Sequence, residues 1–329
     1  MLRALNVRQR TFPLRSPFRI SRGVKLAADV VTVELEQAGC VGRGESVPYA
    51  RYGESLASVT GAIEMLRHAL CAGMGRDELQ ARLHAGAARN ALDAALWDLE
   101  SRLSHVPVWA QLARPPHSPL VTALTIGIEA PQEMANAASR MAGARLIKIK
   151  VDAEDPAARI EAVRAAAPAA KLIVDPNESW TIDILREVQP ALERASVSLL
   201  EQPLPAGADD ALLEFSSPIP LCADEACHTT SNLPSLLNRY QAVNIKLDKA
   251  GGLTEAWRLL RDARAHGLSV MVGCMVCSSL GIAPALEVAR EADFIDLDGP
   301  LWLESDYADG VTLRDGLLMP PSPGFWGGE

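Results

Sequence analysis

Two lysines one residue apart end a short apolar strand. Lys148 and Lys150 alternate with aliphatic residues in the segment Leu146 to Val151. Alternate side chains of a strand point to the same face, so both ammonium groups face one way. In a strand of branched aliphatic residues that face is normally buried. We therefore expect these two lysines to have partners or a chemical task there.

Single charged residues also stand at the ends of later apolar runs. Three acids do so on three successive predicted strands, and a third lysine ends the strand after them: Asp175, Glu201, Asp224 and Lys246. A parallel α/β barrel builds its active site from residues at the carboxyl ends of its strands. Three carboxylates converging from rigid strands suit a hard divalent cation, and we predict Mg²⁺ as their ligand. The alternative is that each acid pairs with a lysine in a buried ion network.

A cation flanked by amines suits the removal of a proton next to a carboxylate. The metal would stabilise the enediolate that forms, while a lysine takes the α-proton. A free lysine has a pKa of roughly 10.4, and a neighbouring ammonium and a divalent ion would both lower it. Lys150 and Lys246 on opposite faces could exchange the proton and invert the centre, with Lys148 tuning and positioning. This arrangement predicts racemisation or epimerisation, whereas one working base predicts elimination.

A regular alternation of strands and helices must position these residues. Ala-rich helical stretches such as Pro156 to Ala167 and Leu253 to His266 separate the strand candidates. Eight strands with short crossovers favour a closed barrel over an open sheet, and the second strand then faces the sixth. The eight candidates are Val121 to Ile128, Leu146 to Val151, Leu172 to Asp175, Ser198 to Glu201, Leu221 to Asp224, Val243 to Leu247, Ser269 to Gly273 and Phe294 to Leu297.

The chain is long enough for a second, smaller domain. It has 329 residues, whereas one such barrel typically takes about 250. Strand-like patterns up to about Glu45 and a strong helix over Ala87 to Glu100 predict an α+β unit before the barrel. We predict an α+β capping domain at residues 1–115, a modified (β/α)7β TIM barrel at 116–300, and a C-terminal segment, 301–329, that returns to the capping domain.

Composition excludes several classes of protein. The net charge of -9 provides no basic surface for nucleic acid or an anionic membrane. The start, Met1 to Arg8, lacks the apolar stretch of a signal peptide. Leu268 to Leu286 is uncharged and long enough to span a membrane, but its glycines, proline and serines favour a strand, a loop and a helix start. We expect a cytoplasmic enzyme with a small-molecule substrate, and leave a homo-oligomer open.

Several other polar residues near these motifs have simpler interpretations. Cys274-Met275-Val276-Cys277 has the spacing of a zinc or redox motif, but no second cysteine pair occurs, so a packed loop is favoured. We expect Glu225 to point away from Asp224 and to support the site. His228 is interpreted as a helix-start residue, and Asp248 with Lys249 as a polar rim.

The charged motifs together resemble the enolase superfamily, in its muconate-lactonising branch. The shared elements are Lys148-Ile149-Lys150, the three single acids, Asn177 two residues after Asp175, and Asn244-Ile245-Lys246. Pro176 departs from the small residue expected there. That superfamily uses a lysine or histidine base with magnesium stabilising an enediolate. The resemblance covers nearly the whole chain and implies the same fold, metal and ligands here.

Within that branch, Asp296-Leu297-Asp298 resembles the Asp-x-Asp signature of dipeptide epimerases. There the paired aspartates hold the α-ammonium of the substrate, and Asp296 and Asp298 do share a strand face. Asn244 to Glu255 and Arg51 to Ser55 resemble the L-Ala-D/L-Glu epimerases of bacterial murein-peptide recycling.

The same resemblance implies how a dipeptide would be bound. Arg22, in the first capping loop, would reach the glutamate end of the substrate, and Thr125 and Lys148 would line that end. The predicted activity is thus a Mg²⁺-dependent epimerisation of L-Ala-D/L-Glu, by proton transfer between Lys150 and Lys246.

Other activities stay open at this point. N-acylamino acid racemisation, o-succinylbenzoate synthesis and sugar-acid dehydration use the same scaffold, but their substrates bring no α-ammonium to the aspartate pair. A metal-free barrel lyase would form a Schiff base through Lys246 or Lys150. A non-catalytic barrel would keep the metal for stability alone.

Overall fold

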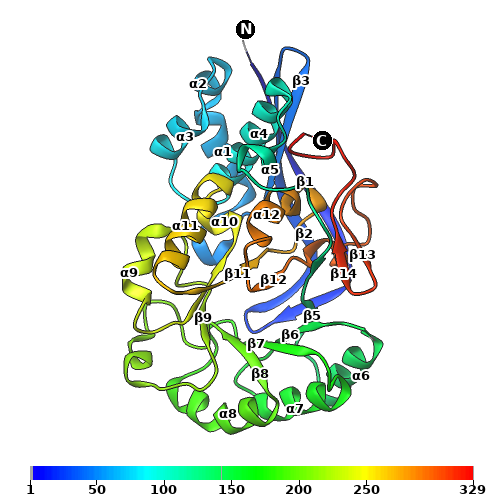
Figure 1. Ribbon diagram of the computed structural model, residues 1–329, viewed down its shortest axis with the longest axis vertical. Coiled ribbons are helices and arrows are strands. Elements are labelled where there is room, and N and C mark those ends of the chain that lie inside the picture. Colours follow the sequence, from blue (N-terminus) through cyan, green and yellow to red (C-terminus); the bar gives the residue numbers. More distant parts are fainter. Residues whose placement is uncertain (1–2, 142, 329) are drawn as a thin grey trace.

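The chain forms a capping domain that sits on one end of an α/β barrel (Figure 1). This computed structural model describes residues 3–141 and 143–328. Three terminal residues lie outside the described residues: Met1, Leu2 and Glu329. The first two belong to the start of the chain, which we expect to lack a signal peptide, and the last ends the predicted C-terminal segment.

The capping domain is built on a three-stranded antiparallel sheet of β1 (Ala4–Ile20), β2 (Gly23–Gln37) and β3 (Cys40–Ser46). Helix α4 (Ala87–Ser104) packs closely on β3, and a Cβ at Gly44 would lie 2.1 Å from the carbonyl oxygen of Ala91. Only glycine permits that approach. The shorter elements of this domain are η1 (Ala50–Tyr52), α1 (Leu56–Met65), α2 (Arg67–Cys71), α3 (Arg76–Arg82) and α5 (Val108–Gln111).

All eight predicted barrel strands are present and form one parallel sheet in chain order. They are β5 (Leu124–Ile126), β6 (Leu146–Lys150), β7 (Lys171–Asp175), β8 (Val197–Glu201), β9 (Leu221–Ala223), β10 (Ala242–Ile245), β11 (Ser269–Gly273) and β12 (Phe294–Asp296). The first and last strands meet where the Ala123 amide donates to the carbonyl oxygen of Ile295 at 2.7 Å, which nearly closes the ring. The predicted modified barrel is confirmed.

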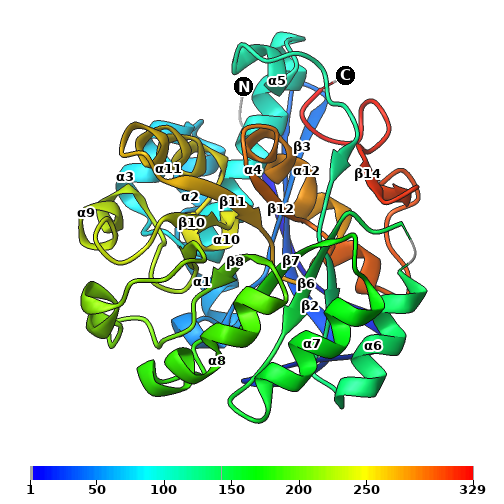
Figure 2. The same cartoon turned by 60° about the horizontal axis from the view of Figure 1, so that its bottom comes forward.

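Helices cover the outside of the barrel. Figure 2 shows α6 (Pro131–Arg140), α7 (Pro156–Ala166) and α8 (Ile182–Arg194) side by side. On the other side lie α9 (Leu233–Leu236), α10 (Leu247–Ala250), α11 (Leu253–Ala265) and α12 (Ser279–Ala289), with the 3-10 helices η2 (Asp210–Glu214), η3 (Thr230–Asn232) and η4 (Gly299–Trp302) in connections. In the described chain, no helix is long and apolar enough to cross a membrane. The segment Leu268 to Leu286 is instead divided between β11, a loop and α12.

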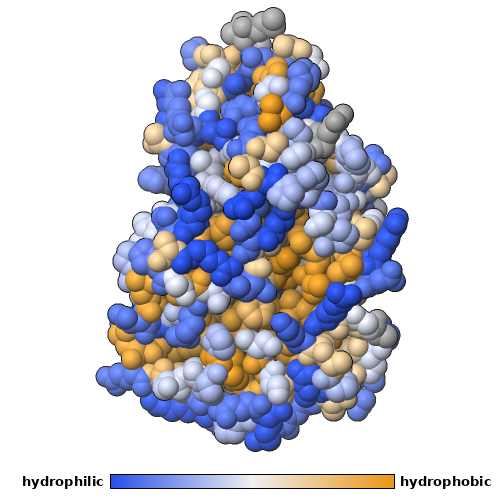
Figure 3. Space-filling view, in the orientation of Figure 1, coloured by the Kyte–Doolittle hydropathy of each residue, from blue (hydrophilic) through white to orange (hydrophobic). Residues whose placement is uncertain are grey.

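The end of the chain lies against both domains. Strand β13 (Thr312–Arg314) pairs with β14 (Leu317–Met319), which pairs with β4 (Leu120–Val121) beside the barrel. The last described residues then reach helix α4, where the Gly327 amide donates to Asp98 Oδ1 at 2.8 Å. Figure 3 shows hydrophobic residues gathered over the barrel half of one face, whereas the edges are mainly hydrophilic.

The interior of the barrel is packed at the amino ends of its strands. A small apolar cluster fills it there: Ala123, Leu146, Ile173, Leu199, Cys222, Ala242 and Met271. Such a floor makes the barrel a packed core and not a pore. The polar side chains of the strands therefore gather at the opposite, carboxyl end.

Candidate active site

Lys148 lies at the centre of the charged residues at the carboxyl end of the barrel. Its Nζ is 3.0 Å from Asp175 Oδ2, 2.7 Å from Glu201 Oε2 and 2.8 Å from Asp296 Oδ2. The side chain is only 1% exposed. One ammonium thus serves carboxylates from three different strands, β7, β8 and β12.

The two lysines predicted to exchange a proton stand on opposite flanks. Lys150 Nζ lies 2.6 Å from Asp175 Oδ2, and Lys246 Nζ lies 2.7 Å from Asp224 Oδ2. Their strands, β6 and β10, are four places apart in a ring of eight. Each lysine therefore has its own carboxylate partner and its own side of the cavity.

The Asp224 carboxylate controls the charge state of Lys246. Burial lowers the pKa of Lys246, and so does the neighbouring Lys148 ammonium, but the Asp224 carboxylate more than offsets burial and raises this pKa well above its usual value. The further lowering expected from a bound divalent ion stays a prediction.

The acids fit a divalent cation through their charge and spare oxygens. Five carboxylates (Asp175, Glu201, Asp224, Asp296 and Asp298) face four ammonium groups (Lys148, Lys150, Lys246 and Lys249) in a buried site. Burial and the nearby Asp175 raise the pKa of Glu201 to about 7. Glu201 Oε2 and Asp224 Oδ1 lie near ammonium groups but accept no hydrogen bond of good geometry. Excess negative charge on all-oxygen donors is what a hard cation requires.

The predicted alternative, a buried ion network, is also visible in this arrangement. In the part of the chain that the structure describes, no three Asp, Glu, His or Cys side chains are already grouped so as to hold a metal ion. Asp175, Glu201 and Asp224 would each have to exchange an ammonium partner for the cation. Neighbouring amides orient two of them, because Asn177 Nδ2 donates to Asp175 at 3.2 Å and Asn244 Nδ2 donates to Glu201 at 2.8 Å.

The Asp-x-Asp pair lies beside this lysine network. The Thr125 amide donates to Asp298 Oδ2 at 2.7 Å, and Thr125 Oγ1 lies 3.5 Å from Asp296 Oδ1. Burial and the charge of Asp296 raise the pKa of Asp298 to about 6. Two crowded, buried carboxylates at this position can bind a cationic group of a ligand.

Arg22 reaches the same cavity from the tip of the β1–β2 hairpin. It lines the cavity together with Lys150, Lys246 and Asp298. Its Nη1 lies 2.8 Å from Glu225 Oε1, so Glu225 contacts the capping domain. The structure thus brings every predicted site residue to one end of the barrel.

Lys249 is buried, so the prediction of a polar rim is wrong for this residue, whereas Asp248 is partly exposed. Lys249 Nζ lies 2.7 Å from Asp224 Oδ1 and donates to the carbonyl oxygens of Cys227 and Asn244 at 2.8 and 2.9 Å. Asp248 accepts the Val47 amide at 3.0 Å. The spacing in the sequence could have indicated that Lys249 faces the site, because it lies one helical turn after Lys246. Gly251, with a φ of 76°, ends that turn.

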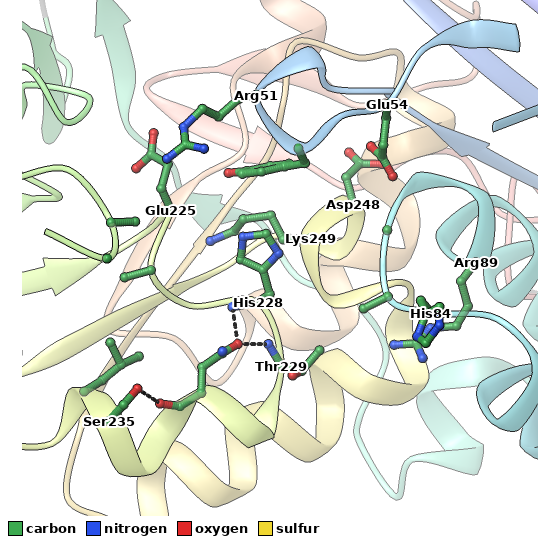
Figure 4. Close-up of a pocket in the computed structure, with 18 of the residues that line it drawn as sticks. Arg51, Glu54, His84, Arg89, Glu225, His228, Thr229, Ser235, Asp248 and Lys249 are labelled. Atoms are coloured by element: carbon green, nitrogen blue, oxygen red, sulfur yellow. Dashed lines mark hydrogen bonds between the residues drawn. The ribbon is translucent and has the colours of Figure 1, made fainter. Parts of the chain in front are cut away.

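A separate cleft of about 1040 Å³ lies between the capping domain and the barrel (Figure 4). Arg51 and Glu225 stand at one end of it, and His84 and Arg89 at the other. His228 lines the cleft, and burial lowers its pKa to about 4, so its imidazole is neutral. Tyr52 and Glu225 line both this cleft and the lysine cavity. They form part of the wall between the two.

Two family models match the chain in succession. Residues 3–112 match the N-terminal domain of mandelate racemase and muconate lactonizing enzyme, and residues 132–325 match the enolase C-terminal domain-like model. The chain belongs to the enolase superfamily. Its resemblance at the level of single motifs therefore extends over both domains.

Individual relatives in this superfamily are also similar over nearly their whole length. The L-Ala-D/L-Glu epimerase of Escherichia coli is 48% identical over 96% of this chain and 99% of its own length. An N-acetyl-D-glutamate racemase of Pseudoalteromonas is 45% identical over 91% of this chain and 95% of its own length.

Solved structures show the same similarity. An enolase family member from Agrobacterium tumefaciens with homology to dipeptide epimerases, with bound sodium and L-Ala-L-Glu, has a TM-score of 0.96 and 46% identity over 99% of this chain and all of its own. A dipeptide epimerase of Enterococcus faecalis, complexed with Mg and L-Leu-L-Tyr, has a TM-score of 0.90 and 29% identity over 98% of both chains.

Proposed function

We propose that this protein is an isomerase that epimerises dipeptides, with L-Ala-D/L-Glu as its substrate. The observation that carries the proposal is the pair Lys150 and Lys246, which stand on opposite flanks of one buried cavity with separate carboxylate partners. The 48% identity to an L-Ala-D/L-Glu epimerase supports it. So does the similarity to structures that hold dipeptides.

The two lysines would exchange the α-proton of the second residue of the dipeptide. In one direction neutral Lys150 Nζ takes the proton from one face, and the Lys246 ammonium returns a proton to the other face, with the roles reversed for the other epimer. Both side chains are at most 8% exposed, which keeps bulk water from the planar intermediate. Asp175 and Asp224 would hold the two amines in position.

The remaining site residues would bind cofactor and substrate. Asp175, Glu201 and Asp224 would hold Mg²⁺, which when bound supplies positive charge opposite the reacting carboxylate. Asp296 and Asp298 would bind the α-ammonium of the dipeptide. Arg22, Thr125 and Lys148 would line its glutamate end.

The direct test is deuterium incorporation. L-Ala-D-Glu and L-Ala-L-Glu are incubated with the enzyme and Mg²⁺ in heavy water, and the α-carbon of the second residue is followed by NMR. We expect exchange and formation of the other epimer from both. Absence of exchange across a panel of dipeptides would defeat the proposal.

Racemisation of N-acetyl-glutamate is a second candidate, favoured by the 45% identity to an enzyme of that name. The aspartate pair separates the two functions, since an N-acetyl group carries no positive charge for Asp296 and Asp298 to bind. A larger kcat/KM for N-acetyl-glutamate than for L-Ala-Glu would make it the principal activity. The activity of a Schiff-base lyase would instead be unaffected by chelators, and borohydride would trap the adduct of its lysine with a carbonyl substrate.

The cellular setting is part of the proposal and stays a prediction. We place the reaction in the cytoplasm, in murein-peptide recycling, because the sequence motifs resemble enzymes of that process.

A further inference from the structure

Glu178 joins three segments of the chain over the mouth of the barrel. Its Oε2 accepts hydrogen bonds from Arg22 Nη1 at 3.2 Å and Arg51 Nε at 2.8 Å. Its Oε1 accepts from Arg51 Nη2 at 2.9 Å and from the Ala206 amide at 2.8 Å. The carboxylate is only 7% exposed. One side chain therefore links the β1–β2 hairpin, η1 and the loop after β8.

The backbone before Glu178 is shaped for this task. Asn177 and Glu178 have φ angles of 47° and 66°, in the left-handed region that costs free energy for residues other than glycine. The Asn177 amide donates to Asp175 Oδ1 at 2.8 Å, while its carbonyl oxygen accepts from Arg22 Nη1 at 3.1 Å. This turn therefore couples the position of Asp175 to that of Arg22.

These contacts use only one side of the Arg22 guanidinium. Nη1 faces Asn177, Glu178 and Glu225, whereas Nη2 makes one long hydrogen bond, 3.3 Å, to the Tyr49 hydroxyl. Among the described residues, Arg22 Nε donates no hydrogen bond. The Nε–H and Nη2–H edge of a guanidinium is suited to bidentate binding of a carboxylate. That edge belongs to a side chain that lines the lysine cavity.

The charges of this cluster balance, so geometry must select the ligand. Two guanidinium groups, Arg22 and Arg51, face two carboxylates, Glu178 and Glu225. Net positive charge therefore contributes little to the attraction of an acidic side chain. Selection of the ligand then depends on the fixed orientation of the Nε and Nη2 edge of Arg22.

We propose that Glu178 is a positioning residue that, anchored by Arg51, fixes Arg22 so that its Nε and Nη2 edge meets the side-chain carboxylate of the substrate. This inference rests on the proposed dipeptide epimerase function and assigns its selectivity for glutamate to a residue outside the reacting centre. Arg51 is 40% exposed, so the anchor can be changed without opening the core.

The experiment compares Glu178→Gln with the wild-type enzyme, in the presence of Mg²⁺, on L-Ala-L-Glu and its uncharged isostere L-Ala-L-Gln. We expect KM for L-Ala-L-Glu to rise about tenfold with kcat changed less than about threefold, and KM for L-Ala-L-Gln to change less than about twofold. Arg51→Met should shift the same KM in the same direction by a smaller factor. Equal losses with both dipeptides, or no loss with either, would overturn the proposal.

Two controls separate positioning from general damage. Glu129→Gln removes an exposed carboxylate that lies 4.0 Å from Arg19 on the same hairpin, and it should leave both KM values unchanged. In an Arg22→Met background, Glu178→Gln should add no further loss, because its effect acts through Arg22. A full additional loss there would contradict the assignment.

A readout without substrate keeps this inference separate from the proposed function. Arg22 lies in the hairpin that Glu178 holds, so trypsin should cleave after Arg22 about fivefold faster in Glu178→Gln, at unchanged global stability. If neither dipeptide is a substrate, the proposed function fails, while faster cleavage still supports the Glu178 contact. Unchanged rates of cleavage after Arg22 would contradict the positioning role of Glu178, whatever the substrate is.

Discussion

Lys148 on β6 and Asp296 on β12 are joined by a 2.8 Å hydrogen bond, although β5 lies between their strands in the ring. The same ammonium contacts Asp175 and Glu201, so one charge links the candidate metal ligands to the aspartate pair. A dipeptide whose ammonium binds Asp296 would compete with Lys148 for that carboxylate. Substrate binding and the charge balance of the proposed metal site would therefore be coupled through Lys148.

Asp298→Asn tests the aspartate pair without removing a partner of Lys148. The asparagine can still accept the Thr125 amide that Asp298 accepts now. We expect kcat/KM for L-Ala-L-Glu to fall roughly 100-fold, because one of two anions facing the substrate ammonium is lost. N-acetyl-L-glutamate, measured by the same deuterium exchange, should lose much less. Equal losses for both compounds would show that the pair does not bind an ammonium group.

Lys150→Ala and Lys246→Ala should each abolish epimerisation, because inversion needs a base on one face and an acid on the other. Each variant removes one ammonium whose carboxylate partner lies within 2.7 Å. One variant should retain α-proton exchange with a single epimer of the dipeptide, and the other variant with none or with the opposite epimer. Similar residual exchange of both epimers in both variants would contradict the two-face assignment.

Metal removal should affect stability as well as activity. We expect dialysis against a chelator to abolish exchange and Mg²⁺ to restore it. At about 100 times its dissociation constant, a ligand that binds only the folded state adds roughly 2.7 kcal/mol. The melting temperature should therefore rise with Mg²⁺ in the wild type and in Asp183→Asn, whose side chain is 87% exposed. It should not rise in Asp224→Asn, and a rise there would remove Asp224 from the ligands.

Sequence alone predicted the barrel and the charged residues at the carboxyl ends of its strands, because both are local patterns. Lys150 and Asp175 each end an apolar run, and a parallel barrel brings such ends together. The sequence does not indicate the full length of β1, because this strand is largely exposed and carries no continuous apolar pattern. Glu178 was missed for another reason, since Arg22 and Arg51 lie more than 120 residues away in sequence. No local spacing predicts a contact that only the packing of two domains creates.

Lys249→Met should destabilise the protein strongly. The ammonium is buried with the Asp224 carboxylate and with the carbonyl oxygens of Asp224, Cys227 and Asn244, which lie in β10 and in the loop after β9. Removing one partner of a buried ion pair typically costs about 3–5 kcal/mol. Urea unfolding should show this loss, whereas Lys171→Met, at the exposed start of β7, should change stability by less than about 0.5 kcal/mol. Comparable unfolding midpoints for the two variants would mean that Lys249 does not hold the Asp224 loop.

Glu45 gives the junction between capping domain and barrel a defined pH dependence. This buried side chain on β3 accepts the Ser278 amide at 2.8 Å and the Ser278 hydroxyl at 2.6 Å, at the start of α12. Burial raises its pKa from 4.5 to about 7. Between these values the folded protein binds a proton that the unfolded chain has released, so stability falls as pH rises through this range.

Glu45→Gln should therefore flatten the pH dependence of stability. The amide cannot ionise, so the fall in unfolding free energy between pH 5 and 8 should shrink by roughly 1–3 kcal/mol. Part of the slope should remain, because burial also raises the pKa of Asp248 to about 7. Glu36→Gln, on an exposed position of β2, is the matched control and should leave the slope unchanged. The measurement is the urea unfolding midpoint of each variant at the two pH values. An unaltered slope in Glu45→Gln would show that Glu45 is already ionised in the folded protein.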